Sequence, residues 1–169
     1  MAIRSVSAGD IPRIHAILVS TGVFTPAEIE CADELVAEAV HEPHKGDYLV
    51  HVIEDDAGVQ GYVCFGATPL TEGTYDLYWI AVDPSQHGRG HGQKLVAFVE
   101  AWLQEHGGRL LLIETSSKDD YGPTQAFYLR CGYTELARVP AFYRPGDDKI
   151  VYGKYLSPGT SDRAGHAVR

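Results

Sequence analysis

A glycine-rich loop that joins a strand to a helix constrains the fold of this chain more than any other feature. Residues 74–82 read as a strand, and the sequence Gly-Arg-Gly-His-Gly follows at 88–92. After the loop, apolar residues recur at i, i+1, i+4, i+7 and i+8, which predicts an amphipathic helix that ends near residue 106. They are Leu95, Val96, Val99, Trp102 and Leu103. A strand that passes through such a loop into a helix is typical of folds that mix α and β elements.

The remaining segments predict a strand, two helices, three strands, a helix, a strand, a helix and two strands, in that order. This order indicates an α+β (mixed α/β) fold around one central sheet. The expected strands are 2–6, 48–53, 59–65, 74–82, 110–115, 133–139 and 149–156, and the expected helices begin near 11, 26, 93 and 123. We expect one domain over residues 1–156. The tail 157–169 has almost nothing to bury, and we expect it to be disordered.

Composition and charge exclude several classes of protein. The 169 residues are 44% hydrophobic, and 23 acidic residues outnumber 14 Lys and Arg to give a formal net charge of −9. That sign disfavours nucleic acid as a partner, because affinity for nucleic acid comes from neutralising phosphates. Neither a secretory signal nor an apolar run of about 20 residues occurs, so we expect a cytoplasmic protein with no membrane partner. The three cysteines form no C-x-x-C pair and are expected to be reduced thiols.

The loop has a local charge opposite to that of the whole chain. No acidic residue occurs between Asp83 and Glu100. The basic and titratable side chains there are His87, Arg89, His91 and Lys94. Glycines at a helix N-terminus let the backbone approach an anion and offer it unpaired N–H groups, so a pyrophosphate would fit. The alternative is a glycine-rich turn that only connects the strand to the helix.

Other ligands fit this loop less well. A dinucleotide fingerprint needs a glycine where Gln93 stands, and the G-K-[ST] sequence of a Walker A loop is absent. His87 and His91 are four residues apart, as two metal ligands on a helix would be, but the glycines between them favour a loop. We therefore expect no metal.

At three places the sequence resembles the GNAT superfamily of acetyl-CoA-dependent N-acyltransferases. These are the strand 78–84, the loop 86–92 and the segment 126–133, and the similarity extends over about 2–156. The resemblance implies a mostly antiparallel, twisted sheet of about seven strands flanked by four helices and splayed at the cofactor cleft. It also implies transfer of an acetyl group from acetyl-CoA to a primary amine.

In that superfamily a Q/R-x-x-G-x-G/A segment wraps the pyrophosphate of the cofactor. Gly90 and Gly92 match the two small positions, whereas His87 stands at the leading Gln/Arg position and Gln86 lies one residue too early. We expect weaker side-chain contacts but retained binding, since backbone N–H groups provide most of the grip. By resemblance, the cofactor-binding residues are Ile80, Ala81, Val82, His87, Gly88, Arg89, Gly90, His91, Gly92, Gln93 and Phe127.

A second motif of the superfamily, N-x-x-A-x-x-F/L-Y-x-x-x-G-F/Y, is matched in part. Tyr121 stands at the Asn position and Thr124 at the Ala position. The matching residues are Phe127, Tyr128, Gly132 and Tyr133. The resemblance makes Tyr128 the candidate proton donor to the leaving thiolate, because a phenol with a reference pKa of ~10 lies close to an alkyl thiol. The alternative is that Tyr128 only packs in the core beside Phe127.

Two carboxylates are candidates for the general base, acting through a water. Glu114 near the end of its strand and Asp76, five residues before Ala81, match positions used by different members of the superfamily. Both residues also have simpler interpretations: Glu114 as a strand-end carboxylate in solvent, and Asp76 as a cross-strand charge partner.

The resemblance implies an acceptor that is a small molecule or a peptide with a primary amine. Five acidic residues lie on the second helix and would attract a cationic acceptor. The alternative is that they form only a solvent-exposed face of the helix. They are Glu28, Glu30, Asp33, Glu34 and Glu38. Aromatic residues could line an acceptor pocket or belong to the sheet, namely Tyr75, Tyr78, Tyr121, Phe142 and Tyr143. The alternative function is a non-catalytic acyl-CoA-binding regulatory module. A homodimer is also possible by resemblance, because members of the superfamily often pair through their last strands.

Overall fold

The computed structural model describes residues 1–156, so the tail expected to be disordered lies outside the described residues. Seven strands form one sheet in the order β1-β2-β3-β4-β5-β7-β6. The strands are β1 (Ala2–Ser5), β2 (Leu49–Asp55), β3 (Gly58–Ala67), β4 (Thr74–Val82), β5 (Leu110–Ser116), β6 (Thr134–Arg144) and β7 (Asp147–Tyr155). Four α-helices accompany them, α1 (Ile11–Thr21), α2 (Pro26–His41), α3 (His91–Glu105) and α4 (Gly122–Arg130), together with the short 3₁₀ helices η1 (Ala8–Asp10), η2 (Pro84–Gln86) and η3 (Asp119–Tyr121). The predicted α+β class and element order are confirmed.

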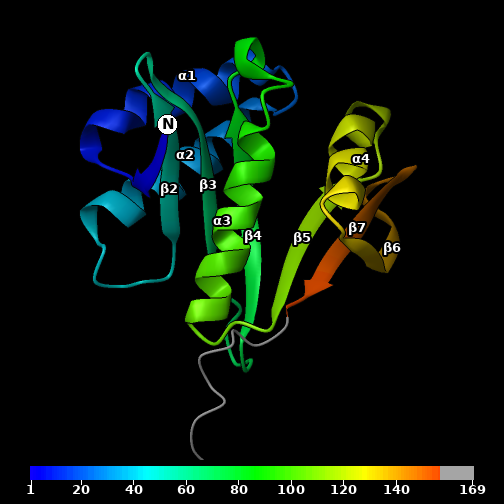
Figure 1. Ribbon diagram of the computed structural model, residues 1–169. Coiled ribbons are helices and arrows are strands. Elements are labelled where there is room, and N and C mark those ends of the chain that lie inside the picture. Colours follow the sequence, from blue (N-terminus) through cyan, green and yellow to red (C-terminus); the bar gives the residue numbers. More distant parts are fainter. Residues whose placement is uncertain (157–169) are drawn as a thin grey trace, which may run out of the picture.

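The sheet opens where β4 and β5 meet. Every other strand pair is antiparallel, but β4 and β5 run parallel. Their pairing begins at Thr74 and Leu110 and ends at Leu77 and Ile113. Beyond that point β5 turns away toward β7, as Figure 1 shows. The edge of β4 after Leu77 therefore has no strand partner on the β5 side, which confirms the predicted splay.

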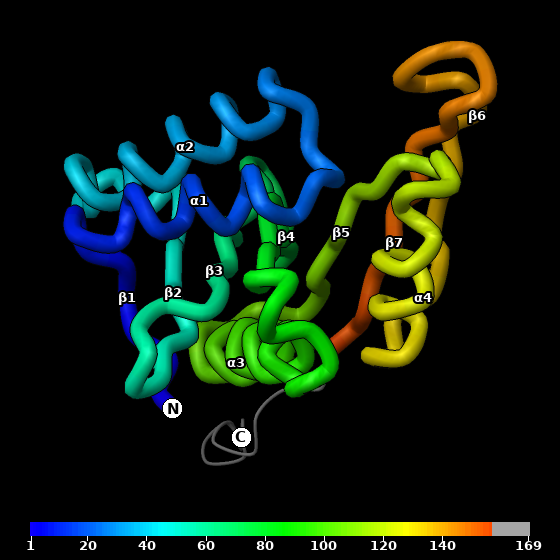
Figure 2. Tube along the Cα trace, turned by 90° about the horizontal axis from the view of Figure 1, so that it is seen from above, coloured from blue at the N-terminus to red at the C-terminus, as the bar shows by residue number. Residues whose placement is uncertain are grey.

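Two helical layers cover the sheet. Figure 2 shows α1 and α2 on one side of β2–β4 and α3 on the other side, with α4 next to β6 and β7. The α1–α2 side packs against β2, β3 and β4 through a buried cluster that includes Ile14, Ile17, Val36 and Tyr62. The α3–α4 side packs through a second cluster that spans the split, with members on α3, α4, β4, β5 and β7. The second cluster thus joins the two halves of the split sheet, whereas the first cluster belongs to the β2–β4 half.

A β-bulge changes which side chains of β4 face which layer. Cys64 pairs with Trp79 and Phe65 pairs with Leu77, so Tyr78 is the extra residue on β4. Before the bulge, Leu77 points to the α3 side, and after it Trp79 points to the α1–α2 side. The bulge lies directly beyond the last residue that pairs with β5, which is where the two strands part.

Local signals account for the start of α2. Thr25 accepts a hydrogen bond from the backbone N–H of Glu28 at 3.3 Å, and Glu28 Oε2 accepts bonds from the backbone N–H and the hydroxyl of Thr25, both at 2.7 Å. This is the capping box that the sequence predicts, with Pro26 at the first helical position. No helix in residues 1–156 has the length and apolar character needed to cross a membrane.

Candidate active site

Two cavities occupy the split between β4 and β5 and share a wall. The smaller, of about 490 Å³, lies between the end of β4, the glycine-rich loop and α4. The larger, of about 740 Å³, lies between α1–α2, β4, β5 and the β6–β7 turn. The residues common to both are Ile80, Ala81, Val82, His87, Thr124 and Tyr128. A ligand in the smaller cavity, here called the loop cavity, would meet one in the larger, here called the acceptor cavity, along β4 and Tyr128.

The chain enters the glycine-rich loop through a pinned turn. The backbone N–H of Asp83 donates to the carbonyl of Gln60 at 2.8 Å, which keeps the end of β4 against β3. The Asp83 carboxylate accepts the backbone N–H of Ser85 at 2.8 Å and Arg13 Nη2 at 2.5 Å. Hydrogen bonds from Ser85, followed by that from Arg13, lower the pKa of Asp83 to about 2. The Asp83 carboxylate therefore stays ionised at neutral pH, and its hydrogen bonds hold the turn in place.

The loop presents a row of unpaired backbone donors. Gly88 and Gly90 have φ angles of 77° and 78°, which only glycine adopts at low cost. The first hydrogen bond of α3 runs from the N–H of Lys94 to the carbonyl of Gly90. The N–H groups of 88–93 donate to no acceptor of residues 1–156, and those of the first helical turn have none by geometry. This arrangement suits an anion at the positive end of the α3 dipole.

The predicted cofactor-binding residues gather at the loop cavity with one exception. Its lining includes Ile80, Ala81, Val82, His87, Gly88, Gly90, His91, Gly92, Gln93 and Phe127. Arg89 is exposed and is not among the lining residues, so only its backbone N–H belongs to the row of donors. His87 Nε2 lies 3.1 Å from the carbonyl oxygen of Val82 and ties the loop to the last residue of β4.

Two side chains of the loop cavity carry buried polar atoms without hydrogen-bond partners. They are Gln86, through Oε1, and His91, through both ring nitrogens, with His91 only 2% exposed. Unpaired buried polar atoms are costly unless a ligand or water satisfies them. A ring N–H of His91 and the free amides fit a phosphate-containing ligand such as coenzyme A, whereas Gln86 Oε1 can only accept a hydrogen bond from a donor. Sequence reasoning had set Gln86 aside because it lies one residue before the motif position, and the 3₁₀ turn η2 explains how it still reaches the cavity.

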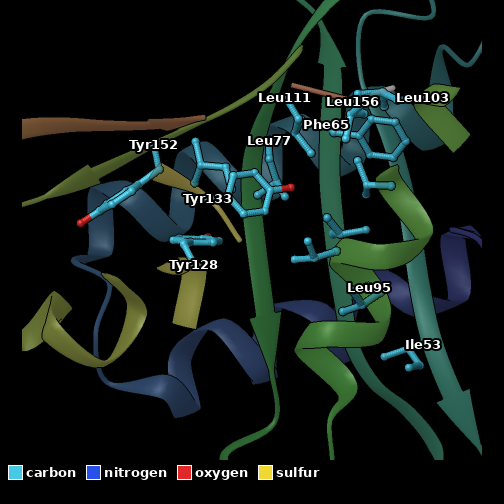
Figure 3. Close-up of a cluster of buried hydrophobic side chains, with 14 of the residues drawn as sticks. Ile53, Phe65, Leu77, Leu95, Leu103, Leu111, Tyr128, Tyr133, Tyr152 and Leu156 are labelled. Atoms are coloured by element: carbon cyan, nitrogen blue, oxygen red, sulfur yellow. The ribbon is translucent and has the colours of Figure 1, made fainter. Parts of the chain in front are cut away.

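Tyr128 combines a packed ring with access to both cavities. Its side chain is 3% exposed, and the ring lies 6.0 Å from that of Tyr133 and 6.3 Å from that of Tyr152, as Figure 3 illustrates. Burial raises its pKa above the ordinary value of a tyrosine. No group within residues 1–156 hydrogen-bonds to its hydroxyl. The ring thus belongs to the core and the residue lines the shared wall, while its role as proton donor stays a prediction.

The two candidate bases both line the acceptor cavity beside the point where the strands part. Glu114 accepts a hydrogen bond from the Tyr143 hydroxyl at 2.7 Å on Oε1 and pairs with Lys149 through Oε2. Asp76 accepts a hydrogen bond from Thr68 at 2.6 Å on Oδ2. Both oxygens of Glu114 are thus engaged, whereas Asp76 Oδ1 receives no hydrogen bond from the described part of the chain.

Some of the predicted acceptor residues line the acceptor cavity, and others do not. Tyr78, Tyr121, Tyr143 and Glu28 are lining residues. Tyr75 instead packs on Trp102 of α3, with ring centroids 5.9 Å apart. The other predicted residues outside the lining are Phe142, Glu30, Asp33, Glu34 and Glu38. The lining also contains residues that sequence reasoning missed, namely Ser116, Lys118 and Asp147.

Metal ligands are not grouped in the described region. Residues 1–156 contain no cluster of three or more His, Cys, Asp or Glu side chains with the geometry of a metal site.

Comparisons with known proteins identify the family to which this split sheet and glycine-rich loop belong. A family model described as an acetyltransferase (GNAT) domain matches residues 46–135. A solved structure from Desulfovibrio desulfuricans, assigned to the GNAT acetyltransferases, is 43% identical, with a TM-score of 0.89 over 92% of this chain and 99% of that chain. The chain belongs to the GNAT family of acetyltransferases. A search of curated proteins found no match.

More distant solved structures share the fold. An aminoglycoside 6'-N-acetyltransferase in complex with coenzyme A is 16% identical, with a TM-score of 0.72 over 94% of this chain and 99% of that one. The ribosomal-protein-S18-alanine N-acetyltransferase of Escherichia coli is 19% identical, with a TM-score of 0.70 over 95% and 97%. An acetyltransferase-like protein from Salmonella typhimurium, crystallised with acetyl-CoA, is 18% identical, with a TM-score of 0.72 over 98% and 99%.

Proposed function

We propose that this protein transfers an acetyl group from acetyl-CoA to a primary amine of a small molecule or peptide by direct attack. The observation that carries the proposal is the position of Tyr128 in the wall shared by the two cavities. A thioester reaching that wall from the loop cavity would meet an amine from the acceptor cavity beside a protonated phenol. Holding two reactants in this way supplies much of the rate enhancement of a transfer reaction.

The residues of the loop cavity fit acetyl-CoA. Its diphosphate would accept hydrogen bonds from the free N–H groups of 88–93, and its pantetheine arm would lie along the unpaired edge of β4 after Leu77. Bound there, acetyl-CoA supplies an activated acetyl group. Relatives with this fold have been crystallised with coenzyme A and with acetyl-CoA, which supports the same use here.

The chain's own groups can balance the protons of the reaction. The amine nitrogen forms a bond to the thioester carbonyl carbon, and the carbon–sulfur bond breaks. Backbone N–H groups on the open edge of β4 can stabilise the oxyanion that develops. The Tyr128 hydroxyl donates a proton to the departing thiolate, and a carboxylate accepts the amine proton through a water.

Asp76 is the better candidate for that carboxylate. Both oxygens of Glu114 are already engaged, Oε1 by the Tyr143 hydroxyl and Oε2 by Lys149, so neither is free to accept a proton from a water. Asp76 keeps Oδ1 free and stands two residues before the bulge, at the apex of the split. Glu114 would then act by holding Tyr143 and Lys149 in place.

Asp76→Asn is expected to lower kcat by about 10²-fold, because it removes the proposed proton acceptor. Glu114→Gln is the matched control, because it also neutralises a carboxylate of the same cavity, and we expect a loss of less than about tenfold. The readout is thiol release at saturating acetyl-CoA. The opposite ranking of the two variants would assign the base to Glu114.

The alternative function is an acyl-CoA-binding regulatory module without turnover. Titration calorimetry with acetyl-CoA and a free-thiol release assay over a panel of amines separate the two functions. We expect binding together with amine-dependent thiol release. Binding with no release above background on any amine would favour the regulatory module, and absence of binding would exclude both functions.

A further inference from the structure

Three polar side chains line the acceptor cavity but not the loop cavity. Glu28 comes from the first turn of α2, Tyr121 from the residue before α4, and Asp147 from the start of β7. Glu28 and Tyr121 lie 93 residues apart in sequence, yet the Tyr121 hydroxyl is 3.5 Å from Glu28 Oε1. We call these residues the outer triad.

The contact between Glu28 and Tyr121 is incomplete. The Tyr121 hydroxyl lies 3.5 Å from Glu28 Oε1, which is longer than the 2.5–3.0 Å of an ordinary O–H···O bond. Glu28 Oε2 is occupied by Thr25 through the capping box, and this holds the carboxylate in place. Glu28 Oε1 is therefore an oriented acceptor with capacity for a better donor.

Asp147 provides an independent sign of a missing ligand. The residue is 2% exposed, and its Oδ1 accepts a hydrogen bond from the Ser116 hydroxyl at 2.5 Å. Its Oδ2 is buried and has no hydrogen-bond partner. A buried carboxylate oxygen without a partner is costly, and a donor bound in the cavity would remove that cost.

Two cations stand near Asp147 without satisfying it. Lys118 Nζ and Arg144 Nε each lie 3.6 Å from Oδ2, beyond hydrogen-bond distance. The Arg144 side chain is 62% exposed and does not line the cavity, so water screens its charge. Among the lining residues, Lys118 is the one Lys or Arg against four carboxylates, those of Glu28, Asp76, Glu114 and Asp147. Glu114 is paired with Lys149 and Asp147 with Lys118 and Arg144, so Glu28 and Asp76 are the lining carboxylates without a cation partner in the described part of the chain. A bound ammonium could take the place of Lys118 beside Asp147.

The charges of both carboxylates of the outer triad act on Tyr121. Burial, followed by the charges of Glu28 and Asp147, raises the pKa of Tyr121 to about 12. The hydroxyl therefore stays protonated at neutral pH, and its oxygen lone pairs remain available to a cationic donor.

We propose that Glu28, Tyr121 and Asp147 bind a second, non-reacting ammonium of the acceptor, so that the preferred acceptors are diamines. This inference rests on the proposed function and deepens it. An ammonium has three donors, which matches Glu28 Oε1, the Tyr121 oxygen and Asp147 Oδ2. The amine at the other end of the molecule would then reach the shared wall at Tyr128.

The test compares α,ω-diaminoalkanes with n-alkylamines of the same length, using thiol release at saturating acetyl-CoA. For the wild-type protein we expect an optimum chain length at which kcat/KM for the diamine exceeds that for the monoamine at least about tenfold, mainly through KM. Glu28→Gln, which keeps the capping box, and Asp147→Asn should each reduce this diamine-to-monoamine ratio by about tenfold. Asp56→Asn removes one negative charge from the exposed β2–β3 turn and should leave the ratio unchanged.

Equal kcat/KM for diamines and monoamines in the wild-type protein would overturn the proposal while leaving the proposed function intact. An unchanged ratio in Glu28→Gln would also overturn it, and this variant decides the matter if Asp147→Asn does not fold. If no amine supports thiol release, the proposed function fails separately. Calorimetric titration of the diamines then decides, because binding weakened about tenfold by Glu28→Gln supports the outer triad and absence of binding contradicts it.

Discussion

The substitution Tyr128→Phe is expected to lower kcat by about 10²- to 10³-fold and to leave the Kd for acetyl-CoA within about twofold of the wild-type value. The substitution removes the hydroxyl but keeps the ring that packs against Tyr133 and Tyr152. Because burial raises the pKa of Tyr128, the wild-type hydroxyl stays protonated through pH 9 and remains a proton donor. Thiol release and titration calorimetry measure the two quantities.

Tyr152→Phe is the matched control for this prediction. Tyr152 is 3% exposed and belongs to the same ring cluster, but it lines neither cavity. Loss of its hydroxyl should leave kcat within about threefold of wild type. If Tyr128→Phe keeps wild-type kcat, Tyr128 is a core residue only. If both variants lose activity equally, the effect arises from packing.

The substitution Gly92→Val is expected to raise the Kd for acetyl-CoA by about 10²-fold or more. This corresponds to the loss of one or two charge-assisted hydrogen bonds. A Cβ at Gly92 would lie 3.2 Å from two ring atoms of Phe127, closer than side chains normally approach. The larger side chain must push Phe127 into the loop cavity or displace the first turn of α3, where the free N–H groups lie.

Gly122→Ala provides a matched control for the loop. A Cβ at Gly122, the first residue of α4, has no heavy atom within 4 Å, so affinity for acetyl-CoA should not change. Thermal melting followed by circular dichroism checks that both variants are folded. Wild-type affinity in a folded Gly92→Val protein would mean that the diphosphate does not bind at this loop.

Local sequence signals were sufficient for most elements of the fold. The capping box at Thr25 and Glu28 and the apolar stripe of α3 each lie within about one element of sequence, and both appear where they were predicted. The bulge at Tyr78 had no such signal, because it depends on the register between β3 and β4. The bulge also explains why Leu77 and Trp79, two residues apart, face opposite layers, Leu77 the α3 side and Trp79 the α1–α2 side.

The site residues that were predicted carry local sequence signals, whereas those that were missed depend on the arrangement of the whole sheet. The loop residues are contiguous, so one motif was enough to group them around one cavity. Asp147 reaches the acceptor cavity only because β7 pairs directly with β5 while β6 takes the outer edge of the sheet. Strand order of this kind depends on the whole sheet, and no pattern near Asp147 carries it. The buried contact with Ser116, 31 residues away in sequence, was invisible for the same reason.

A crystal structure of this protein with acetyl-CoA tests the central claim most directly. We predict that the diphosphate oxygens lie within hydrogen-bond distance of the N–H groups of 88–93, with the thioester sulfur next to the Tyr128 hydroxyl between β4 and β5. A cofactor bound away from the loop, or a thioester that ends outside the wall shared by the two cavities, would contradict the account.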